Sequence, residues 1–243
     1  MDSSRFLSKV DKWDQKILLK YNGIGGKAFT YFLKPISFLG RETIWISLIT
    51  FYLFIWYDPF LFAHFSAIFL NGFIFIFLIK QSTRRSRPFE RFGEEQLVVL
   101  ERKPISKSFP SWHSYNVVSY GLLFGFLLKS PLVVVIMLSI AALVSFSRIQ
   151  LGVHYPTDVI IGFFLGVVGF LFAIYIVSPL LSLLINYLEP LIIHDIQYQQ
   201  FNPMLIHNIW YISLCVGIFS GIFLLAISKV IKEYFISKKE QGL

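Results

Sequence analysis

Residues 147–158 read SRIQLGVHYPTD and separate two long apolar runs. Ionisable side chains are costly inside lipid and are usually functional near it, so Arg148, His154 and Asp158 are expected at a membrane end. His154 and Asp158 are four residues apart and would share one face of a helix. Asp158 could then accept a hydrogen bond from one imidazole nitrogen and leave the other nitrogen basic. Taken alone, these residues also fit a salt-bridged histidine at a helix start.

The composition indicates an integral membrane protein. Of the 243 residues, 56% are hydrophobic and 27 are Phe, which is too apolar for a soluble domain and points to several membrane spans. The formal net charge of +8 suits anionic headgroups or phosphate substrates rather than nucleic acid. Cys215 is the one cysteine and lies in an apolar run, so we expect no disulfide within the chain and no thiolate metal site. We expect no cleavable signal peptide, because residues 1–41 show no short apolar core followed by small residues.

We predict an all-α integral membrane bundle of about six transmembrane helices, forming a single domain over residues 1–243. Residues 1–21 mix cations and apolar side chains in the pattern of an amphipathic helix on the membrane surface. Residues 27–40 are expected to form a second interfacial piece or to extend the first span. Residues 1–41 are therefore the interfacial segment and 42–232 the transmembrane bundle. Backbone groups in lipid must be hydrogen-bonded internally, so the spans are helices. By hydropathy and length the spans lie near residues 42–57, 59–79, 113–128, 131–147, 159–186 and 209–230.

Two further polar clusters would lie on the same side of a six-span bundle as residues 147–158. Residues 80–88 read KQSTRRSRP at the end of the second span, which alone is a common basic flank. Residues 109–113 read FPSWH where the third span begins. Alone they are a helix start capped by Ser111, although a helix N-terminus also binds anions. Together, in this order and on one side, the three clusters predict one site.

The clusters resemble the type 2 phosphatidic acid phosphatase superfamily, whose pattern is K-x6-RP, PSGH and SR-x5-H-x3-D. The resemblance covers about residues 27–175. Trp112 departs from the pattern, because the family usually has a glycine there, which allows close backbone approach. The matching residues are Lys80, Arg87, Pro88, Pro110, Ser111, His113, Ser147, Arg148, His154 and Asp158.

The resemblance implies a metal-independent phosphoric ester hydrolase, a membrane lipid phosphatase that forms a phosphohistidine. His154 would be the nucleophile, Asp158 would orient it, and His113 would protonate the leaving group. Cations at the phosphate would supply the charge that a metal supplies elsewhere, so no metal and no other cofactor is expected. The implied phosphate-binding residues are Lys80, Arg87, Ser111, Trp112 and Arg148.

The substrate is expected to be a lipid phosphate held at the bilayer, such as phosphatidate, phosphatidylglycerophosphate, a polyprenyl diphosphate or lipid A. One alternative is a phosphotransferase that passes the phosphoryl group to a second lipid. Another is a non-enzymatic membrane protein that binds or transports lipids, although headgroup binding needs no oriented histidine. The sequence leaves the oligomeric state open.

Other polar residues are expected outside the chemistry. Arg84 and Arg85 are predicted to be surface cations or headgroup contacts. His64 is predicted to be hydrogen-bonded between helices, and His194 and His207 would lie on the side away from the site.

The charge distribution and the resemblance disagree about which side of the membrane holds the active site. All Lys and Arg residues except Lys129 fall on the active-site side of the six-span topology, which the positive-inside rule places in the cytoplasm. The resemblance implies the extracytoplasmic face of the cell (inner) membrane. The expectation here follows the resemblance.

Overall fold

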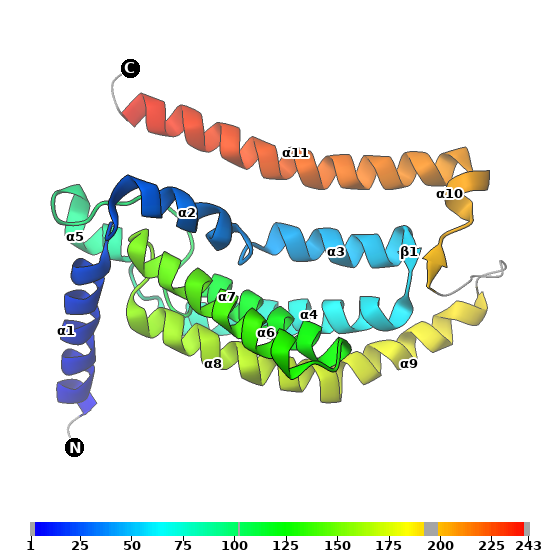
Figure 1. Ribbon diagram of the computed structural model, residues 1–243, viewed down its shortest axis with the longest axis horizontal. Helices are drawn as coiled ribbons and strands as arrows, with labels where there is room; N and C mark the ends of the chain where they lie inside the picture. The colour runs from blue at the N-terminus through cyan, green and yellow to red at the C-terminus, as the bar shows by residue number, and fades with distance from the viewer. Residues whose placement is uncertain (1–2, 102, 192–198, 241–243) are drawn as a thin grey trace. The chain divides into compact units, whose positions relative to one another are not determined.

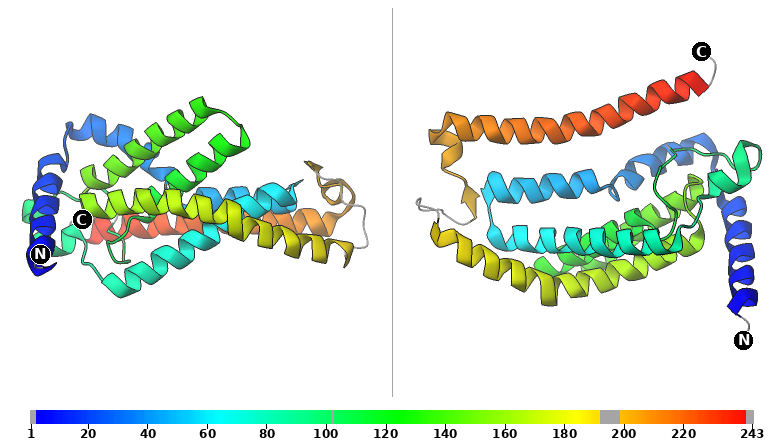
Figure 2. Two further views of the ribbon diagram at one scale, coloured as in Figure 1. Left: turned by 90° about the horizontal axis from the view of Figure 1, so that it is seen from below. Right: turned by 180° about the vertical axis from the view of Figure 1, so that it is seen from behind.

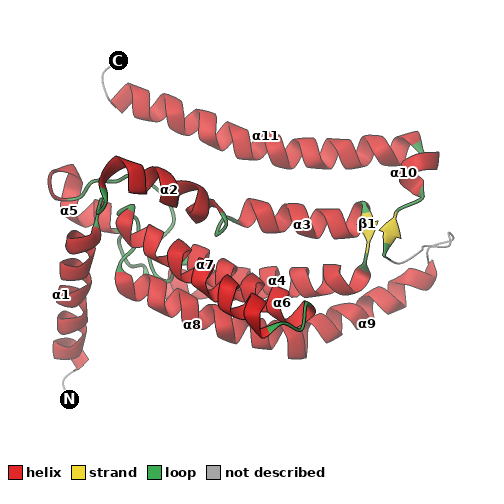
Figure 3. Cartoon of the chain, in the orientation of Figure 1, coloured by secondary structure: helices red, strands yellow, loops and turns green. Residues whose placement is uncertain are grey.

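The computed structural model is almost entirely helical and describes residues 3–101, 103–191 and 199–240 (Figures 1 and 3). The chain divides into two compact units. The first comprises Met1–Arg41 and Ile68–Tyr175, and the second comprises Glu42–Ala67 and Ile176–Leu243.

The first unit consists of helices and holds all three polar clusters. A hairpin of α6 and α7 packs against α8, α2 packs on α7, and α1 contacts both α7 and α8. The helix α4 enters this unit at Ile68. The bounds are α1 (Ser3–Tyr21), α2 (Gly26–Phe38), α4 (Pro59–Thr83), α5 (Pro88–Gln96), α6 (Trp112–Leu127), α7 (Pro131–Gln150) and α8 (Pro156–Phe172).

The second unit has one short antiparallel pairing, between β1 and β2, with Trp56 opposite Phe201. Its helix α3 packs against α11. A π-helical turn, η1, leads from the first unit into α9. The bounds are α3 (Glu42–Phe54), β1 (Trp56–Tyr57), η1 (Ala173–Val177), α9 (Ser178–Leu188), η2 (Glu189–Leu191), β2 (Gln200–Phe201), α10 (Met204–His207) and α11 (Ile209–Glu240).

Proline and serine fix where the helices of the first unit begin. Ser130 caps α7 by accepting from the backbone of Val133, with Pro131 in the first turn, where its missing N–H costs nothing. Pro156 occupies the same place in α8. The end of α7 and the beginning of α8 therefore lie close together in the chain, with residues 151–155 between them.

Glycines on α8 let it approach α6 closely. A Cβ built at Gly162 would lie 2.5 Å from the carbonyl oxygen of Ser111, and one at Gly166 would lie 2.9 Å from that of Tyr115. Small residues of this kind allow membrane helices to pack backbone against backbone. The start of α6 therefore rests directly on α8.

The helix α1 runs across the direction of α7 and α8 in all three views (Figures 1 and 2). Phe6, Leu7 and Trp13 on it are exposed, whereas Asp14 and Leu18 are fully buried. One face of α1 thus lies on the protein and apolar side chains remain exposed, as an interfacial helix requires. The interfacial location stays a prediction.

The predicted fold class is confirmed, because helices occupy most of each predicted span. The span predicted near 42–57 ends in β1, and the span predicted near 159–186 crosses α8, η1 and α9. Three helical stretches among the described residues are long and apolar enough to cross a membrane by themselves, namely Pro59–Gly93, Pro131–Gln150 and Pro156–Leu191. The apolar stretch Ile209–Leu225 is shorter. The predicted organisation as a single domain stays a prediction.

Candidate active site

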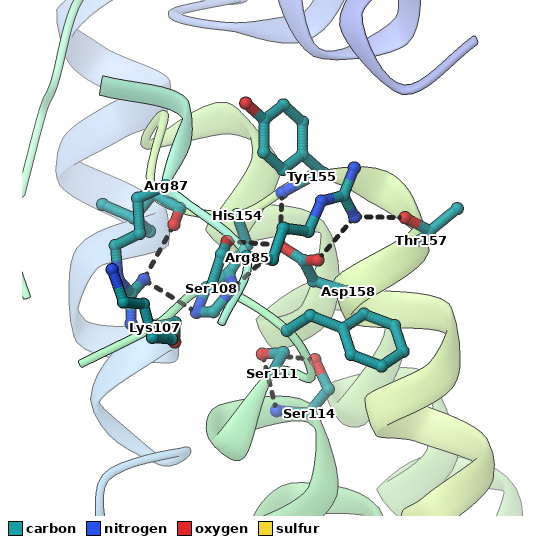
Figure 4. A network of polar contacts seen from close by, with 12 residues as sticks. Arg85, Arg87, Lys107, Ser108, Ser111, Ser114, His154, Tyr155, Thr157 and Asp158 are labelled. Atoms are coloured by element: carbon teal, nitrogen blue, oxygen red, sulfur yellow. Dashed lines mark hydrogen bonds and ion pairs between the residues drawn. The ribbon is translucent and has the colours of Figure 1, made fainter. Parts of the chain in front are cut away.

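The first unit brings the three polar clusters together around His154 (Figure 4). Lys80 lies in the last turn of α4 and Arg87 is the N-cap of α5. His154 lies between α7 and α8, and Asp158 lies in the first turn of α8. Arg87, His154 and Asp158 are buried, with at most 3% of each residue exposed.

The contacts of His154 determine which ring nitrogen is basic. Its Nδ1 lies 3.3 Å from Oδ2 of Asp158, and Nη1 of Arg87 lies 3.1 Å from its Nε2. A guanidinium can only donate hydrogen bonds. Nε2 must therefore accept, and the ring proton sits on Nδ1 and is donated to Asp158. The unprotonated nitrogen therefore faces the guanidinium of Arg87.

The environment keeps His154 neutral. Burial lowers the pKa of His154 well below its ordinary value, and the positive charges of Arg87, Lys80 and Arg148 lower it further. A neutral imidazole retains the lone pair that a nucleophile needs. His154 is therefore neutral across the neutral pH range, which is the protonation state that a nucleophilic role would require.

Arg87 is a buried cation whose guanidinium contacts only neutral acceptors among the described residues. Nε donates to the carbonyl of Ser106 at 2.6 Å, Nη1 donates to that of Val153 at 2.8 Å, and Nη2 donates to Oγ of Ser106 at 3.1 Å. A buried charge that lacks a contacting carboxylate is costly unless it serves an anionic ligand. Such preorganised donors suit a phosphate.

Asp158 is held on both of its oxygens. Oδ2 accepts from Oγ of Ser108 at 2.5 Å and from the backbone N–H of Tyr155 at 2.9 Å. Oδ1 accepts from Nη1 of Arg85 at 2.8 Å. These bonds fix the carboxylate that orients His154.

The segment containing Ser108 is fastened by Lys80. Nζ of Lys80 donates to the carbonyl of Lys107 at 2.5 Å and lies 3.5 Å from that of Ser108. Lys80 is thus connected to the site by its hydrogen bonds to the segment that contains Ser108. Its predicted contact with phosphate stays a prediction.

Ser111 and His113 lie where α6 begins. The backbone N–H of Ser111 donates to the carbonyl of Asp158 at 2.9 Å, which ties the starts of α6 and α8 together. His113 is close enough to Arg148, His154 and Arg41 to interact electrostatically with them. Its Nε2 is buried and has no hydrogen-bond partner in the part of the chain that the structure describes. A ring nitrogen in this state suits proton exchange with a substrate.

Arg148 is buried at the end of α7 and contacts a carboxylate. Its Nη1 donates to Glu101 and, at 2.7 Å, to Oγ of Ser37. Glu101 also pairs with Arg41 at 3.2 Å. Burial raises the pKa of Glu101, but the charges of Arg148 and Arg41 outweigh burial, so the net pKa is lowered. Arg148 therefore reaches the site with a protein carboxylate already bound.

Trp112 packs inside the first unit. Its ring stacks on Tyr115, with centroids 5.9 Å apart, and meets Phe69 edge to face at 6.2 Å. The tryptophan thus adds aromatic packing where a glycine would leave space. Its predicted contact with phosphate through the backbone stays a prediction.

Sequence reasoning missed several residues of this site, Arg85 and Asp14 among them. Arg85 was expected at the surface, but it is paired with Asp158 and with Asp14 of α1, with 23% of its side chain exposed. Asp14 is 0% exposed, although an amphipathic pattern suggests that a charged residue faces water. The one available signal was the presence of an acid within a helix whose other charges are mainly basic.

The other histidines predicted to lie outside the site include His64 and His194. Nδ1 of His64 lies 2.5 Å from Oγ of Ser178, so the predicted hydrogen bond between helices is confirmed within the second unit. His194 lies outside the described residues. In the described ranges no group of three or more His, Cys, Asp or Glu residues could hold a metal ion.

Comparisons with known proteins agree with this geometry. The sequence profile of the PAP2 superfamily matches residues 59–181. A decaprenylphosphoryl-5-phosphoribose phosphatase of Mycobacterium tuberculosis is 40% identical over 37% of this chain and 46% of its own length. An undecaprenyl-diphosphatase of Sulfolobus acidocaldarius is 46% identical over 33% of this chain and 37% of its own. The matched part thus spans less than half the length of these relatives.

Two solved structures are similar as well. A transmembrane PAP2-type phosphatidylglycerolphosphate phosphatase from Bacillus subtilis has a TM-score of 0.53 and 28% identity, over 68% of this chain and 84% of that chain. LpxE from Aquifex aeolicus has a TM-score of 0.54 over 66% of this chain and 93% of that chain. At 18% identity, this second likeness concerns the fold alone.

Proposed function

Because the chain belongs to the PAP2 superfamily, we propose that it is a membrane lipid phosphatase that works through a phosphohistidine and needs no metal. The observation that carries the proposal is the buried Arg87 guanidinium, which faces the unprotonated Nε2 of His154 and contacts only neutral acceptors in the described chain. A lipid phosphate entering here would give Arg87 an anionic partner. It would also place phosphorus in reach of the nucleophile.

In the first step, Nε2 of His154 attacks phosphorus and the bond from phosphorus to the lipid oxygen breaks. His113, protonated in the complex with the anionic substrate, donates its proton to that oxygen, so the lipid leaves as an alcohol or as a lipid monophosphate. The Nδ1 proton stays hydrogen-bonded to Asp158, whose negative charge stabilises the positive charge that develops on the ring. Arg87, Lys80 and Arg148 would stabilise the equatorial oxygens.

In the second step, His113 takes a proton from water, and the water oxygen attacks phosphorus. The bond from phosphorus to Nε2 breaks, so inorganic phosphate leaves and His154 returns to its starting state. General acid–base catalysis by one positioned histidine contributes roughly 10²–10⁴-fold. The three cations would supply the charge stabilisation that metal-dependent phosphatases obtain from ions.

The proposed substrate is a phosphomonoester or diphosphate carried by a lipid. The relatives named above act, by their names, on decaprenylphosphoryl-5-phosphoribose, undecaprenyl diphosphate and phosphatidylglycerolphosphate. Each of these three compounds is an amphiphile that carries a phosphate. The interfacial helix α1 and the apolar spans would keep such a substrate's chains in the bilayer while the phosphate enters the site.

We place the protein in the cell (inner) membrane as a multi-pass protein, with the site on the extracytoplasmic face. Ile105 offers a test, because it lies in the segment that leads to Ser108 and is 91% exposed. A Cys215→Ser background with Ile105→Cys should react with a membrane-impermeant maleimide in intact cells. Labelling only after the cells are opened would put the site in the cytoplasm.

The function is tested with purified protein in detergent, by measuring phosphate release from phosphatidate, phosphatidylglycerophosphate and polyprenyl phosphates, with and without excess EDTA. The wild type should release phosphate in EDTA and be inhibited by vanadate, which imitates the five-coordinate state. His154→Ala and His113→Ala should each abolish release, and His154→Ala should also lose the acid-labile phosphoenzyme. His207→Ala is the matched control, because His207 is exposed on α10 of the second unit. Wild-type activity in His154→Ala, or a strict magnesium requirement, would contradict the proposal.

A further inference from the structure

The first-unit structure joins the interfacial helix α1 to the catalytic aspartate through a continuous set of short contacts. Asp14 of α1 accepts from the backbone N–H of Thr157 at 2.9 Å and from its Oγ1 at 2.5 Å. The same carboxylate accepts from Nη2 of Arg85 at 2.6 Å. Nη1 of Arg85 then donates to Oγ1 of Thr157 at 2.7 Å and to Oδ1 of Asp158 at 2.8 Å.

We propose that Asp14 and Arg85 are positioning residues that hold Asp158 in line with His154, so that α1 is part of the catalytic site. The inference rests on the proposed function above. Both residues would act through the carboxylate of Asp158, without touching the phosphate.

The contact between Asp158 and His154 is the one that needs such support. At 3.3 Å it is longer than the other contacts of this carboxylate, which measure 2.5–2.9 Å. A small rotation of the carboxylate would therefore remove it first. Arg85 is the only side chain among the described residues that contacts Oδ1, so it opposes that rotation from the far side.

Arg85 is itself fixed in place from two directions. Its guanidinium lies over the ring of Tyr155, with Cζ 4.1 Å from the ring centroid, and Asp14 holds its second terminal nitrogen (Figure 4 shows Arg85 between Tyr155, Thr157 and Asp158). Burying Asp14 fully, at 0% exposure, is costly unless its charge is paired. Arg85 thus pairs with two buried carboxylates at once.

The same network explains why a surface helix carries a buried acid. Asp11 lies three positions before Asp14 on α1, and 34% of its side chain is exposed. It contacts Arg91 at 2.7 Å and lies 3.9 Å from Arg85. The pair of Asp11 and Arg91 links α1 to α5 at the protein surface. The deeper carboxylate reaches Thr157, which lies one residue before Asp158.

The test compares Asp14→Asn with Asp11→Asn, the same substitution three positions earlier on α1. We expect Asp14→Asn to lower kcat about 10- to 100-fold, the range for a small misplacement of a catalytic group, with KM changed less than about threefold because phosphate contacts are untouched. Asp11→Asn should stay near wild type. Asp14→Glu should recover part of kcat, because it restores the charge.

Arg85→Lys keeps the inference testable if Asp14→Asn does not fold. The substitution keeps both hydrogen bonds between Asp14 and Thr157. The lysine ammonium, however, cannot bridge the carboxylates of Asp14 and Asp158 as the planar guanidinium does. It should lower kcat like Asp14→Asn, and the double variant should be less than about twofold worse than either, as expected of residues that act as one unit.

Three results would overturn the inference: wild-type kcat in Asp14→Asn, a loss confined to KM, or losses that multiply in the double variant. Failure of the proposed function is distinguishable, because the wild type itself would then release no phosphate, or His154→Ala would remain active.

Discussion

Replacing Gly162 by alanine should slow catalysis by moving the start of α6. Gly162 lies on the buried face of α8, and a Cβ there would sit 2.5 Å from the carbonyl oxygen of Ser111. Ordinary contact begins near 3.4 Å, so α6 and α8 must separate locally by about 0.9 Å. The atom in the way is backbone, and no rotamer change can relieve it.

The displacement acts on the site because Ser111 is bonded to both helices. Its backbone N–H donates to the carbonyl of Asp158 at 2.9 Å, and its carbonyl accepts from Tyr115 at 3.2 Å. Moving Ser111 shifts His113 relative to His154. A misplacement of about 1 Å can cost about 10²-fold in rate, equivalent to about 2.7 kcal/mol of transition-state stabilisation. The overpacking itself should lower stability by about 1–3 kcal/mol.

The assay is kcat/KM for phosphate release in detergent, together with thermal unfolding of the same samples. Gly221→Ala is the matched control, because a Cβ at Gly221 on α11 meets nothing within 4 Å and both substitutions gain the same helix propensity. Gly221→Ala should retain wild-type activity. If Gly162→Ala keeps the wild-type kcat/KM, the packing of α8 on Ser111 does not position His113 for the reaction.

Three further outcomes follow from the site. Because burial and nearby cations lower the pKa of His154, its contribution to stability is present above the unfolded value of about 6.5 and is lost as pH falls toward the folded value; unfolding measured against pH should show this loss in wild type and not in His154→Gln. Trp112→Gly removes the packing on Tyr115 and Phe69, so the kcat/KM ratio between lipid and short soluble phosphoesters should change; equal scaling of all substrates would limit Trp112 to packing. Glu101→Gln removes the carboxylate that Nη1 of the buried Arg148 contacts and should lower the melting temperature, and added phosphate should restore it; a melting temperature unaffected by the substitution would show that Glu101 is dispensable.

The sequence predicted the fold well, because the physics of lipid leaves few choices. Backbone groups in hydrocarbon must pair within their own segment, so each apolar run of sufficient length becomes a helix. The break at Lys129-Ser130-Pro131 ended one helix and began another, as predicted. The pairing of His154 with Asp158 followed from spacing, although they interact across a helix start rather than along a regular turn.

The parts that could not be predicted are contacts between segments far apart in the chain. Asp14 and Thr157 are separated by 143 positions, and no periodicity links them. Glu101 lies in an irregular segment, where pattern gives no direction for a side chain, yet it joins Arg41 to Arg148. Buried charges seek partners wherever the fold supplies them, so such pairs need the three-dimensional arrangement.

These contacts also bear on the conflict over the membrane side. The positive-inside rule concerns cations near span ends that interact with the membrane potential and lipids. Arg85, Arg87 and Arg148 are instead held inside the first unit by protein acceptors, and Arg41 and Arg91 pair with carboxylates. Cations held by protein groups inside the fold do not face the lipid headgroups, so these five say less about orientation than exposed cations do. The extracytoplasmic side stays a proposal, and labelling of Ile105→Cys is its test.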